Sequence, residues 1–455
     1  MGFTSEEHVE TPKNQPTGML AFTIIWIGQM FSLLGTSMTG FALTIWAWQI
    51  TGQATALALV GFFSFAPIVI VSPIAGALVD RYDRKKIMML ADFAAGLPTV
   101  AVLLLYTTGN LQIWHLYITG LVSATFQAFH FPAYSAAVSM MLRKEQYGRA
   151  SGMLATAQFA TGIFAPVVAA LLMTIIGIEG VLMVDITTFI VAISMLFFVH
   201  IPRPPVTEAG RKGMGSIWKE SLYGFRYIRE RRSLLGLQLA FFFSNLAASF
   251  GNTLLAPMIL ARTSDNSVLL ASVMAAGGVG GLIGSILLTV WGGPKRRVHG
   301  VLLGMVFSSL FGLLLMGLGR DIYVWATAYF LSLFFIPIIN GSNQAIWQAK
   351  VAPDVQGRVF ATRLLIAQIS VPVSMLAAGP LADRVFEPAM MQGGSLISTF
   401  GGLVGSGAGA GMSLMFVLAG FFGMLVGFGG YAFHEVRNAE DILPDYDSGK
   451  KEMSA

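Results

Sequence analysis

The stretch GALVDRYDRKK, at residues 76–86, ends with six charged residues among its last seven. Charged residues make up only 11% of this 455-residue chain, whereas 55% of its residues are hydrophobic. Soluble proteins contain about a quarter charged residues, so a chain this apolar is predicted to lie in a membrane. A charged run between two long apolar segments is then a loop at the membrane surface.

Long apolar runs recur on both sides of this loop, and each could cross a hydrocarbon layer about 30 Å thick as a helix. The polar segment before the first run lacks a basic patch, and no cleavage site follows a short apolar core, so no cleavable signal peptide is predicted. The sequence predicts an all-α membrane protein with 12 transmembrane helices, at residues 19–49, 54–79, 87–107, 112–141, 149–175, 179–200, 235–260, 267–291, 299–318, 322–349, 357–381 and 411–433.

The basic residues predict how these spans are oriented. With the amino terminus in the cytoplasm, 25 of the 28 Lys and Arg residues fall on the inner side, and only Arg262, Arg320 and Arg384 fall outside. This bias predicts that both termini are cytoplasmic. The net charge of +5 therefore reflects topology, and no nucleic-acid partner is predicted. The absence of cysteine excludes disulfides, thiolate metal sites and cysteine nucleophiles.

The longest predicted inner loop, residues 201–234, divides the chain. It begins with a proline-rich linker and continues with an amphipathic stretch, which we interpret as a helix on the inner membrane surface. Gln29 and Gln238, and likewise Arg149 and Arg358, lie 209 residues apart on its two sides, which favours duplicated halves. The expected parts are a cytoplasmic tail (1–18), a six-helix bundle (19–200), the linker (201–234), a second six-helix bundle (235–433) and a cytoplasmic tail (434–455).

In the loop at 76–86 the chain resembles the major facilitator superfamily, whose signature there runs Gly-x-Leu-x-Asp-Arg-x-Gly-Arg-Lys. Asp83 stands where the family usually has glycine. The matching residues are Gly76, Leu78, Asp80, Arg81, Arg84 and Lys85. The resemblance covers nearly the whole chain and implies the major facilitator fold, with two six-helix bundles.

The resemblance also implies that this loop is a cytoplasmic gate. In the family, the acid equivalent to Asp80 contacts the start of span 11, which here is Gly357 and Arg358. A carboxylate at a helix amino terminus contributes about 0.3–2 kcal/mol, so Asp80 would latch the two halves together. Arg149 is expected in the same charge network. The alternative is a loop that only anchors the topology.

Drug-exporting branches of the family carry Gly-x8-Gly-x3-Gly-Pro-x2-Gly-Gly in span 5. Small residues there allow close helix contact and a proline bends the span, although ordinary helix packing would explain the same pattern. At that spacing this chain has Gly152, Thr161, Ala165, Pro166, Ala169 and Ala170. The phrases FHFPAYSAAV and AGPLADRVFEP resemble those of macrolide-efflux and siderophore-exporter-like carriers.

Spans 1, 4, 7 and 10 line the central cavity of this fold, as the resemblance implies. Polar residues recur on these spans at helical spacing, although hydrogen bonding between helices would also explain them. The predicted cavity residues are Gln29, Thr36, Gln127, His130, Tyr134, Gln238, Asn245, Asn340, Asn343 and Gln344. No basic residue is expected deep in a span. With 34 Phe and 24 Met in the chain, such a cavity suits bulky, partly lipophilic molecules.

Ionisable residues within spans are costly and indicate function. Asp185, His130 and Asp92 are therefore the candidates for carrying protons. For Asp185 the alternative is a structural contact near the outer face, and for His130 it is a hydrogen bond to substrate or helix. Asp92 is assigned to the inner charge network around Asp80. Span 4 lacks the arginine that proton-coupled drug exporters often place there, which departs from the usual relay.

Taken together, the sequence predicts a secondary active transporter that exports macrolide, drug or siderophore-like molecules by proton antiport with alternating access. The alternatives are an uptake symporter of the same fold and a non-transporting membrane sensor. No HExxH or GxxxxGK[ST] motif is present, so no enzyme, metal or cofactor is predicted. The expected partners are a small-molecule substrate, protons and the lipid bilayer. The protein is expected to be a monomer that crosses a bacterial cell (inner) membrane many times.

Overall fold

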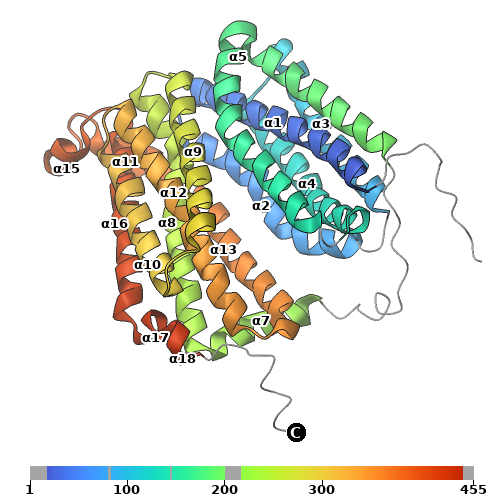
Figure 1. Cartoon of the computed structure of the whole chain (residues 1–455). Helices are drawn as coiled ribbons and strands as arrows, with labels where there is room; N and C mark the ends of the chain where they lie inside the picture. Colours follow the sequence, from blue (N-terminus) through green and yellow to red (C-terminus); the bar gives the residue numbers. More distant parts are fainter. Residues whose placement is uncertain (1–17, 80–82, 144–145, 200–216, 444–455) are drawn as a thin grey trace, which may run out of the picture.

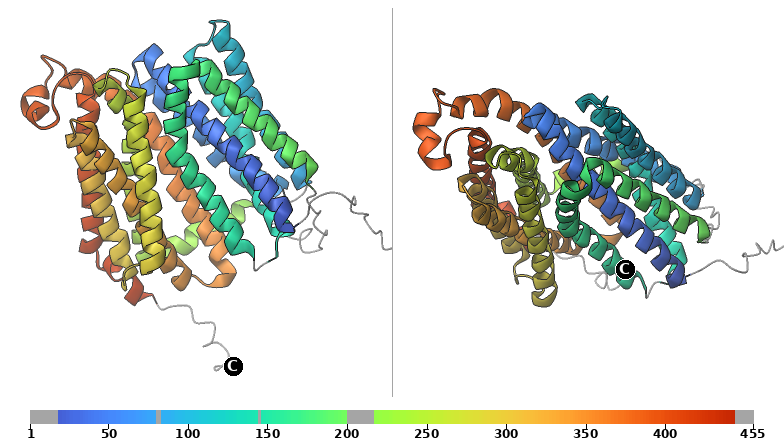
Figure 2. Two further views of the ribbon diagram at one scale, coloured as in Figure 1. Left: turned by 45° about the horizontal axis from the view of Figure 1, so that its top comes forward. Right: turned by 90° about the horizontal axis from the view of Figure 1, so that it is seen from above.

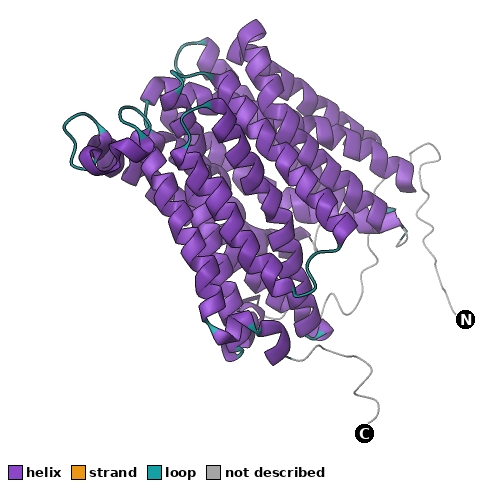
Figure 3. Cartoon of the chain, turned by 60° about the vertical axis from the view of Figure 1, so that its left-hand side comes forward, coloured by secondary structure: helices purple, strands orange, loops and turns teal. Residues whose placement is uncertain are grey.

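The computed structural model describes residues 18–79, 83–143, 146–199 and 217–443 of the chain. Within these ranges the chain forms helices joined by short loops, and no strand occurs in them (Figure 3). The prediction of an all-α protein is therefore confirmed.

The first group of helices comprises five elements. Its members pack in pairs: α1 on α5, α2 on α4, and α3 on both α4 and α5. Gly177 has a φ of 68°, which favours glycine, and it breaks α5 into two segments that correspond to the predicted spans at 149–175 and 179–200. The elements are α1 (Gly18–Thr51), α2 (Ala54–Val79), α3 (Arg84–Thr107), α4 (Ile113–Met141) and α5 (Tyr147–Phe198).

The second group follows the amphipathic helix α7 (Ile217–Glu230), which packs on α13. Within the group α9 packs on α12, and α8 packs on α13 and α16. Two short π-helical segments, η2 and η3, interrupt the regular helices. The elements are α8 (Arg232–Arg262), α9 (Ser267–Trp291), α10 (Arg297–Phe307), η2 (Ser308–Leu314), α11 (Leu315–Leu318), α12 (Ile322–Lys350), α13 (Pro353–Leu381), η3 (Ala382–Phe386), α14 (Glu387–Met390), α15 (Ile397–Val404), α16 (Ala410–Ala432), α17 (His434–Arg437) and α18 (Ala439–Ile442).

Ten helices of the described part are long and apolar enough to cross a membrane. This set counts α5 once, although Gly177 divides it, and it omits α4, whose polar residues lower its mean hydropathy. The count of twelve and the cytoplasmic termini therefore stay predictions. Below, the end of the bundle where α1 joins α2 is called the outer end, following the predicted topology.

The two groups lie side by side, with α15 at the periphery of the second group (Figures 1 and 2). They meet where α2 packs on α13 and where α5 packs on α9. Gly379 of α13 lies directly against Thr55 and Ala58 of α2, where a Cβ atom would have no room. The backbones of α2 and α13 therefore approach each other closely at the outer end. The predicted boundaries of the two bundles remain predictions.

Polar side chains hold both ends of the second group. At the outer end, Arg262 donates to the carbonyl of Val404 (2.5 Å) and Arg320 donates to that of Gly402 (2.7 Å), so α15 is anchored at its carboxyl end. At the opposite end, residues 434–443 form a C-terminal clasp. There Lys350 donates to the carbonyls of Glu440 and Leu443, and the clasp is thereby tied to the end of α12.

Candidate functional site

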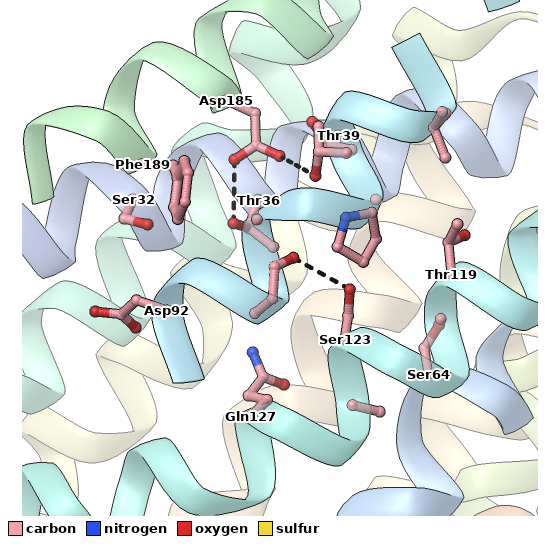
Figure 4. A pocket seen from close by; sticks show the side chains of 18 of the residues that line it. Ser32, Thr36, Thr39, Ser64, Asp92, Thr119, Ser123, Gln127, Asp185 and Phe189 are labelled. Carbon is pink, nitrogen blue, oxygen red and sulfur yellow. Dashed lines mark hydrogen bonds between the residues drawn. The ribbon is translucent and has the colours of Figure 1, made fainter. Parts of the chain in front are cut away.

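A cavity of about 350 Å³ lies inside the first group of helices (Figure 4). We call it the N-terminal cavity. Carboxylates, amides, hydroxyls and one imidazole line it together with apolar side chains, and no lysine or arginine is among its lining residues. The polar members include Gln29, Ser32, Thr36, Thr39, Asp92, Thr99, Ser123, Gln127, His130 and Asp185. The cavity is therefore acidic, and it holds all three predicted proton-carrying residues.

Asp92 of α3 and His130 of α4 form a pair in this cavity. The distance between Asp92 Oδ1 and His130 Nε2 is 3.1 Å, and the two side chains are 15% and 20% exposed. Gln29 of α1 donates to the second carboxylate oxygen at 2.9 Å. The sequence assigned Asp92 to a charge network around Asp80, but its partners among the described residues are Gln29 and His130. Three helices thus meet at one carboxylate.

Asp185, from the second segment of α5, is only 3% exposed. Its Oδ1 accepts a hydrogen bond from Thr36 Oγ1 (3.1 Å) and its Oδ2 accepts one from Thr99 Oγ1 (3.2 Å). Thr39 lies beside the same carboxylate (Figure 4). Hydroxyl donors reduce the cost of burying a carboxylate but do not neutralise its charge. Gly35 permits this arrangement, because a Cβ there would lie 3.1 Å from the Asp185 Cα.

The structure distributes the ten predicted cavity residues over several places. Gln29, Thr36, Gln127 and His130 line the N-terminal cavity. Tyr134 is buried in the packing core of the first group instead.

The five predicted cavity residues of the second half lie elsewhere. Asn245 and Asn340 line a small cavity of about 70 Å³ within the second group. Gln238 donates to the carbonyl of Arg363 (3.3 Å), Asn343 accepts from Trp347 Nε1 (3.0 Å), and Gln344 accepts from Arg363 Nη1 (3.1 Å). Hydrogen bonding between helices, the alternative considered for such residues, describes Gln238 and Gln344, whereas the bond of Asn343 lies within α12.

A second cavity, of about 420 Å³, lies between the two groups and is called the intergroup cavity. Seven helices contribute to it, and the sequence did not single out most of its lining. Tyr329 donates to Asn252 Oδ1 at 3.2 Å across it. Its lining combines hydroxyl, amide, aromatic and thioether groups, among them Ser37, Phe41, Thr44, Thr161, Pro166, Asn252, Met274, Tyr329 and Met375. Asn252 lies on α8 at the same seven-residue spacing as Gln238 and Asn245, and this spacing predicts it as a polar residue of the predicted span at 235–260.

The small residues of the span 5 motif lie where α5 meets α9 and the intergroup cavity. Thr161, Ala165 and Pro166 line this cavity, and Ala169 and Ala170 are buried. Gly152 has open space around its Cα. Most of the motif thus lies on the face of α5 that is directed at the second group.

The predicted cytoplasmic gate lies only partly within the described residues. Asp80 and Arg81 fall outside them. Asp83 accepts from the backbone N–H of Lys85 (3.1 Å) and caps α3, which explains an acid in place of the family's glycine.

The other predicted gate residues each have their own surroundings. Lys85 donates to the carbonyls of Phe197 (2.8 Å) and Val199 (2.6 Å), at the end of α5. The Arg358 guanidinium lies 5.7 Å from the ring centroid of Tyr223 in α7. Gly357 and Arg149 are exposed. Leu78 is half-buried, and Gly76 and Arg84 are described only as members of α2 and α3.

Arg363 is a half-buried cation that the predicted topology places on the inner side. It lies within the apolar helix Val355–Met390, about two turns from the start of that helix. Its guanidinium lies 4.8 Å from the ring centroid of Trp347 and 5.6 Å from that of Phe360. Stacking on aromatic rings stabilises a partly desolvated guanidinium, which explains how the residue is accommodated.

Comparisons with known proteins agree with this architecture. The chain is 26% identical to macrolide efflux protein A of Streptococcus pyogenes over 375 residues, covering 80% of this chain and 90% of that protein. It is 22% identical to the enterobactin exporter EntS of Shigella flexneri over 218 residues, covering 48% of this chain and 52% of that protein.

Among solved structures, a bacterial homologue of the lysosomal transporter Spinster matches with a TM-score of 0.68 at 14% identity, covering 95% of this chain and 100% of that one. A bacterial homologue of the iron transporter ferroportin matches with a TM-score of 0.63 at 14% identity, covering 90% and 99%. The sequence profile of the Major Facilitator Superfamily matches residues 25–375. The chain therefore belongs to the Major Facilitator Superfamily, and it is a multi-pass transport protein of the bacterial cell (inner) membrane rather than an enzyme.

Proposed function

We propose that this transporter exports bulky, partly lipophilic small molecules of the macrolide, drug or siderophore kind by proton antiport. The relatives named as macrolide efflux protein and enterobactin exporter support the direction and the class of cargo. The intergroup cavity, with its thioether, aromatic and amide groups, is the cargo site in this proposal, because such a lining suits bulky amphiphiles.

The observation that carries the proton part of the proposal is the N-terminal cavity. It gathers Asp92, His130 and Asp185 with no lysine or arginine to neutralise them. A proton that binds Asp92 removes its charge and weakens its attraction to His130. A proton that binds Asp185 removes a charge that only hydroxyl groups stabilise. In either case the energies of the packed helices around the cavity change with protonation, which is what coupling requires.

Helix α1 links the two cavities. Thr36 donates to Asp185 in the N-terminal cavity, whereas the next residue, Ser37, lines the intergroup cavity. A shift of α1 on protonation would therefore change the shape of the cargo site. In this mechanism the two groups rock about the cargo, and Asp80 with Gly357 and Arg358 closes the cytoplasmic side in one of the two states.

The test is accumulation of macrolides, dyes and siderophores in a pump-deficient bacterial host, with and without the protein and with a protonophore. The proposal expects lower accumulation with the protein, restored by the protonophore. Asp92→Asn, His130→Gln and Asp185→Asn should each be compared with Asp321→Asn, a matched control because Asp321 only caps α12.

The results of the accumulation assay distinguish export from uptake and test the position of the proton site. If all three cavity variants export at the rate of the control, the proton site is not in the N-terminal cavity. Raised accumulation would replace export by uptake. An unchanged accumulation across the whole panel would contradict the proposed cargo class.

A further inference from the structure

We propose that Asp383 and Trp48 are gating residues that lock the outer ends of the two helix groups together, and that both contacts open when cargo leaves on the outer side. The inference rests on the alternating access proposed above. Both residues lie at the end of the molecule opposite to the predicted cytoplasmic gate.

Asp383 caps a helix that belongs to the other group. Its Oδ1 accepts from the backbone N–H of Ala54 (3.0 Å) and its Oδ2 accepts from that of Thr55 (2.7 Å), which are the first two residues of α2. The first N–H groups of a helix have no partner within it, and a carboxylate there also stabilises the positive end of the helix dipole. The cap is lost as soon as the outer ends of α2 and α13 separate.

The local backbone brings Asp383 into place. The residue lies in η3, a π-helical segment at the end of α13, and such segments are often found at functional sites because they redirect side chains. One turn earlier, Gly379 allows α13 to lie directly against Thr55. The two features together bring the carboxylate within bonding distance of both amides.

A second contact joins the groups at the same end. Trp48 Nε1, near the end of α1, donates to Asp265 Oδ1 at 2.7 Å in the loop between α8 and α9. Trp48 is 7% exposed. Asp265 has a φ of 66° and Ser264 a φ of 50°, the only positive φ values of non-glycine residues in the described chain. Residues are held in this region only when their surroundings compensate, and the bond to Trp48 is a compensating contact.

Two comparable interactions, an aspartate cap and an indole N–H donor, lie within the second group and provide matched controls. Asp321 caps α12 through the N–H groups of Tyr323 and Val324. Trp325 Nε1 donates to the carbonyl of Gly319 at 3.1 Å. Each control substitution removes a similar hydrogen bond at the outer end of the molecule. It leaves every contact between the two groups in place.

The experiment measures the distance between the outer ends by pulsed electron spin resonance. The chain has no cysteine, so Asn110→Cys and Val268→Cys introduce two unique spin labels at exposed positions, one in each group. The purified full chain is studied in lipid nanodiscs. Asp383→Asn with Trp48→Phe should raise the ratio of long to short distances about ten-fold, a change equivalent to about 1.4 kcal/mol. Asp321→Asn and Trp325→Phe should leave the distribution unchanged.

The outcomes decide the inference separately from the proposed export. If the gate variants and the controls give the same distribution, the outer lock does not exist, whatever the protein transports. If the distances lengthen only in the gate variants, the lock stands even when no cargo is found. If Asp383→Asn does not fold, Trp48→Phe alone, which removes the indole N–H donor and part of the ring, should still lengthen the distances relative to Trp325→Phe, in which the same atoms are removed.

Discussion

Gly35→Ala tests the acidic site without changing any charge. Gly35 lies in α1 directly opposite Asp185, and a Cβ there would collide with Thr188 Oγ1 and would lie 3.1 Å from both the Cα and the Oδ1 of Asp185. Carbon atoms in contact prefer separations of about 3.5–4.0 Å, so the Thr188 hydroxyl must turn away and the backbones of α1 and α5 must move apart by roughly half an ångström. The bond between Thr36 and Asp185, already 3.1 Å long, would then exceed the usual range.

Two contributions determine how much Gly35→Ala lowers the free energy of unfolding. Inserting a methyl group into a packed contact costs about 1–3 kcal/mol, which outweighs the gain of up to about 1 kcal/mol from replacing a helical glycine. A lost hydrogen bond to a buried carboxylate costs about 1–3 kcal/mol more. We expect Gly35→Ala to lower the melting temperature by several degrees and to reduce export strongly.

The assay compares thermal unfolding, followed by tryptophan fluorescence, with export in the pump-deficient host. The control is Gly429→Ala in α16, where a Cβ would meet open space. In a chain that already carries Asp185→Asn, Gly35→Ala should reduce export little further, because both changes act on one group. Equal melting temperatures and equal export for Gly35→Ala and the control would refute the reasoning.

Three further changes have defined outcomes. Asp80→Asn should reduce export several-fold while immunoblots show normal protein levels, because the predicted inner latch is weakened; native export would count against that latch. Gly280→Ala should destabilise the protein by about 1–3 kcal/mol in thermal unfolding, since its Cβ would collide with the backbone carbonyl of Phe330, and an unchanged melting curve would contradict the close contact of α9 and α12. Arg262→Gln should speed hydrogen exchange at residues 401–409, because it removes the donor to Val404; equal exchange rates would show that α15 does not need this anchor.

The fold was predictable because membrane helices leave a strong signal in composition. Runs of apolar residues predicted the helices, and the loop signature at 76–86 indicated the family. The family profile, which matches residues 25–375, confirms the family. The two segments of α5 were predicted separately, although the structure joins them at Gly177.

The site was predictable only in part. Helical spacing grouped Gln29 with Thr36 on one face of α1, but these residues and His130 were predicted in a central cavity shared by both halves, whereas they line the N-terminal cavity within the first group. Spacing within a helix does not reveal which other helix faces it, so the pairing of Asp92 with His130 was missed. The bond from Asp383 to α2 joins residues more than 300 positions apart, and no local pattern encodes such a contact.

The C-terminal clasp has a practical consequence for protein engineering. Lys350 holds the carbonyls of Glu440 and Leu443, Asp441 pairs with Arg296, and Glu440 accepts from the N–H of Val298 (2.8 Å) at the start of α10. A reporter domain fused after residue 443 leaves these bonds in place. A deletion that starts before residue 440 would uncover the ends of α10 and α12 together, so shortened versions for imaging or crystallisation should keep the clasp.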